Sequence, residues 1–144
     1  MNSWLIIGYG NTLRNDDGVG QIIAQTIEKS SFLNVKCIYQ HQLTPELVEN
    51  IKLFQNVIFI DASVESLKVD VINLPRFNIN NYAEYGHYCN PEYLLYLTKL
   101  IYNESPKSYL ITIPIENIDL GENLSPLAKK GMEKAVKIIT EMIF

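Results

Sequence analysis

Short apolar runs alternate with segments of helical periodicity from one end of the chain to the other. The apolar runs are nearly continuous and end at turn residues, which is typical of strands buried on both faces of a parallel sheet. On this basis we expect five strands, which cover Trp4 to Gly8, Val35 to Tyr39, Val57 to Ile60, Lys68 to Leu74 and Tyr109 to Ile113.

Four further segments predict helices. The first, from about Gly18 to Ser30, carries apolar residues at helical spacing. Each of the other three begins with a polar residue followed by proline, which is the usual pattern of a helix N-terminus. These starts are Thr44-Pro45, Asn90-Pro91 and Ser125-Pro126, and the last helix is expected to run nearly to Phe144.

The alternation of strands and helices predicts an α/β fold. We expect a three-layer α/β/α sandwich with a mostly parallel twisted sheet of about five strands. Residues 1–144 are expected to form a single domain. Segments 75–89 and 114–123 lack periodicity and predict irregular loops. Because ligands of such sheets bind beyond the carboxyl ends of the strands, the residues that follow each strand are the functional candidates.

The composition narrows the function classes. The 144 residues carry a net charge of −4, so neither nucleic acid nor a membrane surface is an expected partner. No apolar run reaches the roughly 18 residues of a membrane span, and the first residues lack the basic start of a signal peptide. Cys37, expected in the core, and Cys89, a loop thiol and weak candidate ligand, fit reduced thiols of a cytoplasmic protein.

Glycines and acids follow the first predicted strand. The segment from Gly8 to Gly20 begins like a G-x-G-x-x-G dinucleotide site, but Leu13 stands where the third glycine is needed. The two aspartates of this segment, Asp16 and Asp17, would repel a phosphate. No Walker A sequence follows. For Asp16, a helix cap and a functional role are about equally favoured. For Asp17 a functional role is favoured, because a second strand end offers it a carboxylate partner.

That partner is Asp61, at the tip of a buried strand, where a turn role is the alternative. His87 lies shortly before the third helix, and His41, beyond the second strand, is the competing imidazole. Asp17, Asp61 and His87 together would form an oxygen and nitrogen site for a divalent metal, open to substrate or water. Because G-x-S-x-G and H-E-x-x-H motifs are absent from the sequence, any hydrolysis would have to use carboxylate, histidine and metal.

The whole pattern resembles the nickel–iron hydrogenase maturation endopeptidases. The segment from Gly8 to Gly20 is similar to the N-terminal signature of that family, and later matches follow in order over nearly all of the chain. These matches are His41 to Leu47, Asp61-Ala62, His87 with Pro91, Leu94 and Leu95, and Leu124-Ser125-Pro126.

The resemblance implies a metal-dependent or aspartic-type endopeptidase. Members of the family remove a C-terminal peptide from a hydrogenase large-subunit precursor once nickel has been inserted. The matching motifs place the catalytic and metal-contacting residues at Asp17, Asp61 and His87. Nickel would be recognised on the substrate rather than held permanently, and other divalent ions could occupy the site. We expect the protein to act as a monomer in the cytoplasm.

Three positions depart from the family pattern. Asp17 stands where glutamate is frequent, and its shorter side chain reaches less far. Gly86 stands where a small hydroxyl residue is common, and Asn15 where glycine is usual. Asparagine is the next best residue for a left-handed turn, so the first loop is expected to keep its conformation.

Two other function classes remain open. A non-catalytic nickel-binding or precursor-binding chaperone on the same fold would associate with a large subunit without changing its mass. A Rossmann-like small-molecule binder is disfavoured by the missing third glycine and the paired acids.

Overall fold

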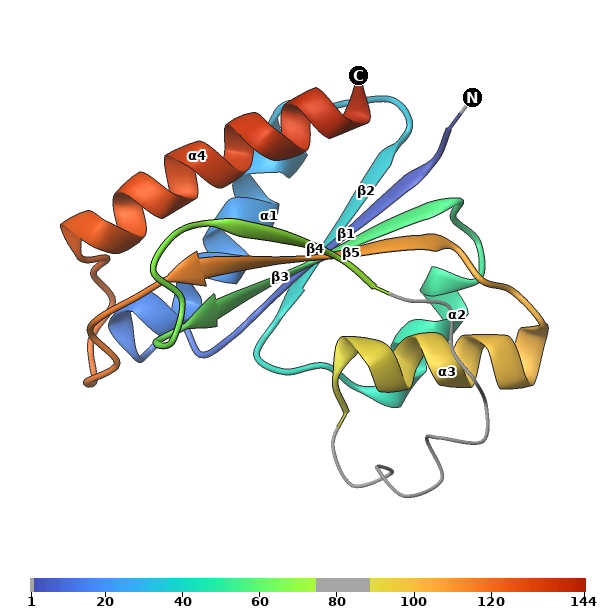
Figure 1. Cartoon of the computed structure of the whole chain (residues 1–144), viewed down its shortest axis with the longest axis horizontal. Helices are drawn as coiled ribbons and strands as arrows, with labels where there is room; N and C mark the ends of the chain where they lie inside the picture. The colour runs from blue at the N-terminus through green and yellow to red at the C-terminus, as the bar shows by residue number, and fades with distance from the viewer. Residues whose placement is uncertain (1, 75–88) are drawn as a thin grey trace.

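Among residues 2–74 and 89–144, which the computed structural model describes, five strands form one sheet (Figure 1). In this part of the chain the strand order is β2-β1-β3-β5-β4, and β4 runs antiparallel to β5 while the other neighbours are parallel. The strands are β1 (Trp4–Tyr9), β2 (Val35–Gln40), β3 (Asn56–Ser63), β4 (Asp70–Asn73) and β5 (Lys107–Pro114).

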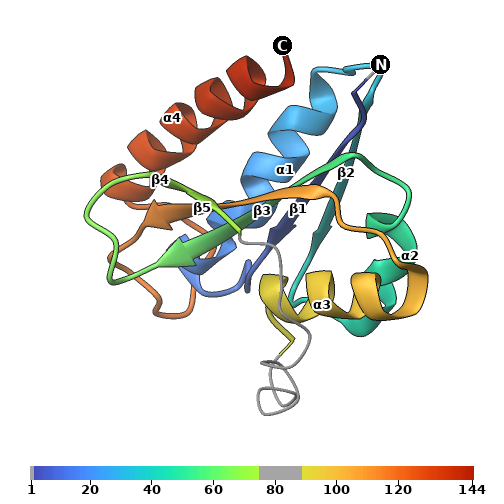
Figure 2. The same cartoon turned by 45° about the vertical axis from the view of Figure 1, so that its right-hand side comes forward.

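Helices cover both faces of the sheet (Figures 1 and 2). On one face lie α1 (Val19–Lys29) and α4 (Pro126–Ile143), and on the other α2 (Val48–Ile51) and α3 (Pro91–Tyr102). The 3₁₀ turns η1 (Asn15–Gly18) and η2 (Pro45–Leu47) precede α1 and α2. This is the predicted three-layer α/β/α sandwich. No helix in residues 2–74 and 89–144 has the length and apolar character needed to cross a membrane.

Alternate strand residues point to the two helical layers. Ile6 and Ile58 pack in the core under α1 and α4, whereas Ile7 and Phe59 pack in the core under α2 and α3. Because both faces of β1 and β3 are buried here, the runs Trp4 to Ile7 and Val57 to Ile60 are apolar at every position and show no alternation.

The helix starts differ in how they are capped. Asn90 accepts a 2.7 Å hydrogen bond from the Tyr93 N–H, and Ser125 accepts a 3.2 Å bond from the Ala128 N–H. These two side chains cap α3 and α4 as their sequences predict. Thr44 makes no side-chain cap bond, and the second helix begins with the 3₁₀ turn η2 before the single turn of α2.

The prediction that Asp61 follows its strand was wrong. β3 continues to Ser63, because its last residues pair with the end of β5, Asp61 with Thr112 and Ser63 with Pro114. Asp61 therefore lies inside a strand whose backbone holds it. Of the predicted loop 75–89, residues 75–88 lie outside the described residues.

Two glycines let α1 approach the sheet closely. A Cβ on Gly20 would lie 2.6 Å from the carbonyl oxygen of Ile60 and 2.7 Å from that of Tyr9. A Cβ on Gly8 would lie 2.0 Å from the carbonyl oxygen of Gly20. Such contacts leave no space for a side chain, so the start of α1 packs directly against the ends of β1 and β3, next to Asp61.

We expect Gly20→Ala to destabilise the protein by about 2 kcal/mol or more, because the new methyl group would meet backbone oxygens that cannot move aside. This loss exceeds the gain of about 1 kcal/mol from the higher helix propensity of alanine. Gly131→Ala in α4 is the matched control, since its Cβ would meet the Ile113 side chain at 2.8 Å. Urea unfolding compares the two variants. An equal or smaller loss for Gly20→Ala would contradict the close packing.

Candidate active site

Polar side chains follow the apolar residues of the central strands at the carboxyl edge of the sheet. Asp61 of β3 pairs with Thr112 of β5. On the other side of β3, Gly8 of β1 is paired with Ile60, so Tyr9 is the next residue in line with Asp61. Tyr9 packs against the core under α2 and α3, and Asp61 therefore points to this same face.

Asp61 is half-buried and its carboxyl group is perturbed. Burial, reinforced by the negative charge of Asp17, raises the pKa of the Asp61 carboxyl to about 6. The Tyr9 hydroxyl and the Ala62 N–H act as hydrogen-bond donors to the carboxylate and oppose this rise. Burial and the Asp61 charge in turn raise the pKa of the Tyr9 phenol above its ordinary value, so Tyr9 remains protonated and able to donate.

Asp17 reaches the site from η1, in the loop after β1. Its Oδ2 atom accepts a 2.8 Å hydrogen bond from the backbone N–H of Asn11, which folds the loop around the carboxylate. Gly10 makes this fold possible, because its φ is +140° and a Cβ there would lie 2.0 Å from the Asp17 carbonyl oxygen. The structure thus brings the predicted pair, Asp17 and Asp61, close enough for one charge to act on the other.

Asp16 has a different environment from its neighbour. It is fully buried, and its carboxylate accepts four hydrogen bonds from the segment that follows β5. The donors are the N–H and hydroxyl of Ser125, both at 2.7 Å, and the N–H groups of Glu116 and Asn117, both at 3.1 Å. Burial alone would raise the pKa of Asp16, but these bonds outweigh it and hold the pKa below its ordinary value. Asp16 therefore anchors two loops, and it does not cap its own helix.

Asn15 adds to this anchor in the left-handed conformation that its sequence position predicts, with φ 46°. Its N–H donates to the Gly121 carbonyl at 2.8 Å, and its side chain bonds the backbone of Asp119 and Asn123. Gly121 has φ +153°, and a Cβ there would lie 2.4 Å from Asn15 Oδ1. The loops after β1 and β5 lie side by side in both views as a result (Figures 1 and 2).

The other predicted site residues are not brought to the two carboxylates by the described part of the chain. His87, the predicted third ligand, and Gly86 lie outside the described residues. His41 is exposed, and its contact with the first loop is through its carbonyl oxygen, which accepts the Gly10 N–H at 3.0 Å. Within residues 2–74 and 89–144, no group of three or more His, Cys, Asp or Glu side chains is arranged to hold a metal ion.

Two residues of the site were missed from the sequence. Tyr9 lies between Gly8 and Gly10 at the end of β1. Its position on the strand next to Asp61 is the signal from which it could have been predicted. The sequence predicts Ser125 as the start of the last helix, where it is the cap, but its hydroxyl also donates to Asp16 across 109 positions of sequence.

Comparison with solved structures places this arrangement in a known fold. The hydrogenase maturating endopeptidase HybD from E. coli matches with a TM-score of 0.74 and 18% identity, over 95% of this chain and 89% of that chain. The [NiFe] hydrogenase maturation protease HybD from Thermococcus kodakarensis matches with a TM-score of 0.72 and 22% identity, over 97% and 98% of the two chains. The chain has the fold of the hydrogenase maturation proteases. No family model matches the chain, and no curated protein matches it significantly by sequence.

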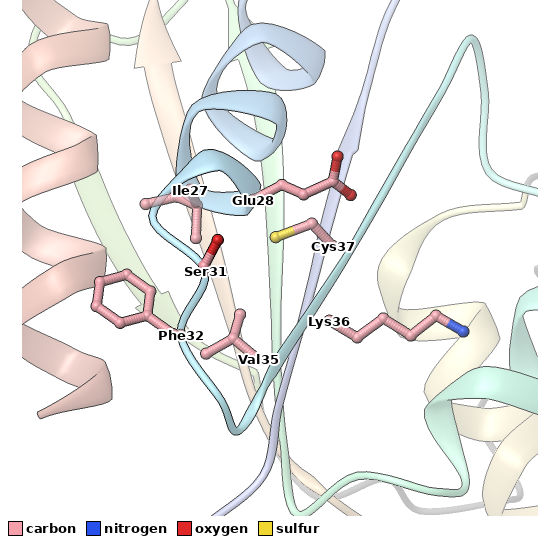
Figure 3. Close-up of a pocket in the computed structure, with 7 residues that line it drawn as sticks. All are labelled: Ile27, Glu28, Ser31, Phe32, Val35, Lys36 and Cys37. Carbon is pink, nitrogen blue, oxygen red and sulfur yellow. The ribbon is translucent and has the colours of Figure 1, made fainter.

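Asp61 lies toward the carboxyl end of β3, and at the opposite edge of the sheet of this hydrogenase maturation protease fold lies the pocket that Figure 3 draws. It has a volume of about 260 Å³ and lies between the end of α1 and the start of β2. Burial and the charge of Glu28 raise the pKa of the Cys37 thiol to about 12, so the thiol stays protonated and unreactive. Cys37 packs against the core as predicted. The pocket is therefore separate from the candidate site.

We expect Asp16→Asn to lower the free energy of unfolding by about 2 to 4 kcal/mol at pH 7, because the amide leaves buried donors without acceptors. Since the folded-state pKa of Asp16 is lowered, its stabilisation is present above the ordinary carboxyl pKa and is lost as pH falls through the folded value. The difference between wild type and variant should therefore shrink in acid. Urea unfolding at neutral and acidic pH measures it.

Asp17→Asn is the matched control, since Asp17 is half-buried and accepts the Asn11 N–H, a bond that an amide oxygen can keep. Its loss of stability should be smaller. Equal losses for the two variants would contradict the anchoring role of Asp16.

Proposed function

We propose that this protein is an endopeptidase of hydrogenase maturation, which removes a C-terminal peptide from a nickel-loaded large-subunit precursor. The observation that carries the proposal is the pair of Asp17 and Asp61 at the carboxyl edge of the sheet, with the pKa of Asp61 raised to about 6. A carboxyl group tuned toward neutral pH and a second acid beside it are typical of hydrolytic sites. The fold is the one on which named hydrogenase maturation proteases are built.

The reaction in this proposal is attack of water on one peptide bond. With a pKa of about 6, Asp61 is largely ionised at neutral pH and basic enough to take a proton from the attacking water. The water oxygen bonds to the carbonyl carbon, the carbon–nitrogen bond breaks, and the departing nitrogen takes up the proton that Asp61 removed from the water. The negative charge of Asp17 contributes to the raised pKa of Asp61 and so to its basicity.

Nickel enters the proposal as part of the substrate. Two carboxylates and an imidazole make a donor set that suits divalent ions such as nickel, with the oxygens at Asp17 and Asp61 and the nitrogen proposed at His87. Contact with the nickel of the precursor would select metal-loaded subunits for cleavage. Action as a monomer in the cytoplasm, where the free thiols Cys37 and Cys89 persist, belongs to the same proposal.

Mass spectrometry of a large-subunit precursor, incubated with this protein with and without nickel loading, tests the function. We expect the nickel-loaded precursor to lose a C-terminal peptide and the nickel-free precursor to stay intact. Asp61→Asn should slow cleavage by about 100-fold or more, because it removes the base. Glu133→Gln, which removes an exposed acid on α4, is the matched control and should cleave like wild type.

Three results separate the alternatives. Nickel-dependent association with no change in the mass of the precursor would replace the peptidase by the non-catalytic chaperone. Cleavage by Asp61→Asn at the wild-type rate would overturn the role of Asp61. If the precursor is neither cleaved nor bound, the proposed function is overturned.

A further inference from the structure

The two loops beside the candidate site expose large apolar side chains. Leu13, in the loop after β1, is 57% exposed, and Ile118 and Leu120, in the loop after β5, are 46% and 77% exposed. We call these three residues the loop patch. Single exposed apolar side chains are ordinary, but the loop patch combines three of them from two segments that are more than 100 positions apart in sequence, and this requires a physical explanation.

Backbone hydrogen bonds bring the members of the patch together. The Gly121 N–H donates to the Leu13 carbonyl at 2.8 Å, and Arg14 and Gly121 form a parallel bridge. Leu13 and Leu120 directly precede the two bridged residues, so they lie on adjacent segments at the same level. The Arg14 guanidinium donates to the Ile118 carbonyl at 3.2 Å, which ties the third member to the same bridge.

The patch is held rigid by polar groups and not by its own side chains. Asp16 and Asn15 fix both loops with the hydrogen bonds described above. Exposed leucines add little to such a framework. Exposed apolar area is unfavourable in water, and this unfavourable free energy is removed only when another surface covers the side chains. A rigid, exposed apolar surface next to a reactive centre is what a docking protein substrate needs, since little order is lost when it binds.

The charges around the patch define the chemistry of the partner. Glu116, Asp119 and Glu122 are exposed on the same segment as Ile118 and Leu120. The cation of the first loop, Arg14, is partly occupied by its bond to a carbonyl oxygen. The rim of the patch is therefore acidic, and it complements an apolar surface flanked by lysine or arginine.

We propose that the loop patch is the surface on which the precursor protein docks, through an apolar segment flanked by basic residues. This inference rests on the proposed function and gives it a second point of contact. Asp17 lies three residues beyond Arg14 in the same anchored loop, so a substrate held on the patch is held at a fixed position relative to the carboxylate pair. Docking at the patch and cleavage at Asp61 are then separable steps.

The test compares Leu13→Ser/Leu120→Ser with wild type on the nickel-loaded precursor. For the precursor we expect KM to rise about tenfold or more with kcat unchanged, because two interface leucines are lost. Asp119→Lys/Glu122→Lys should weaken precursor binding in the same way, and added salt should weaken wild-type binding.

The control variant is Leu33→Ser/Leu53→Ser. These leucines are 96% and 68% exposed and precede β2 and β3, at the opposite end of the sheet. Both double variants should keep the wild-type unfolding midpoint, since all four side chains are exposed. Wild-type KM for Leu13→Ser/Leu120→Ser would overturn the docking surface while leaving the peptidase intact.

Direct binding of the precursor, measured by biolayer interferometry, separates the remaining outcomes. If wild type binds without cleaving and the patch variant does not bind, the docking surface stands and the peptidase proposal fails. If wild type neither binds nor cleaves the precursor, both proposals fail. A wild-type dimer that the patch variant dissolves would show that a second copy of this chain occupies the patch, and it would overturn the precursor as the occupant.

Discussion

The buried carboxylate of Asp16 is the interaction on which the candidate site depends. Its two oxygens accept four hydrogen bonds from the segment after β5, and the carboxylate itself belongs to the loop after β1. A buried charge without these donors would cost several kcal/mol, and the donors without the charge would be left unpaired. Each loop therefore needs the other. Asp17 is the next residue in the chain, so the same anchor sets its position beside β3.

The pKa values of two acids in this region, Asp16 and Asp61, are shifted in opposite directions. Asp16 is buried among donors, which hold its pKa low and make it a structural charge. Asp61 is less completely buried but has weaker compensation and a second negative charge nearby, which raises its pKa to about 6. Environments that push the pKa values of nearby carboxyls apart give them separate tasks. When a carboxyl group has a raised pKa in the folded protein, its ionised form lowers the free energy of unfolding. Such a loss of stability is typical of residues that serve catalysis.

The sequence predicts those features that depend on local pattern. Buried strands such as Val57 to Ile60 and capped helix starts such as Asn90-Pro91 carry strong local signals, and the order of elements follows from them. The antiparallel direction of β4 and the extension of β3 past Asp61 depend on pairing with β5, which no local signal encodes. The pairing of Asp16 with Ser125 joins residues far apart in the chain, so only the tertiary structure reveals it.

The candidate site, like the fold, was predicted only in part. Asp17 and Asp61 could be selected because acids at the carboxyl ends of parallel strands converge at one edge, and the structure brings them together. Tyr9 was missed because a tyrosine between two motif glycines has no local signal of contact with an acid on another strand. The role of His87 stays a prediction.

We infer that Asp17 and Asp61 form one electrostatic unit. NMR titration of the Asp61 carboxyl carbon, in wild type and in Asp17→Asn, tests this claim. We expect a pKa of about 6 in wild type and a lower value in the variant, because the variant removes one of the two causes that raise it. An ordinary carboxyl pKa in wild type, or the same raised pKa in both proteins, would contradict the claim.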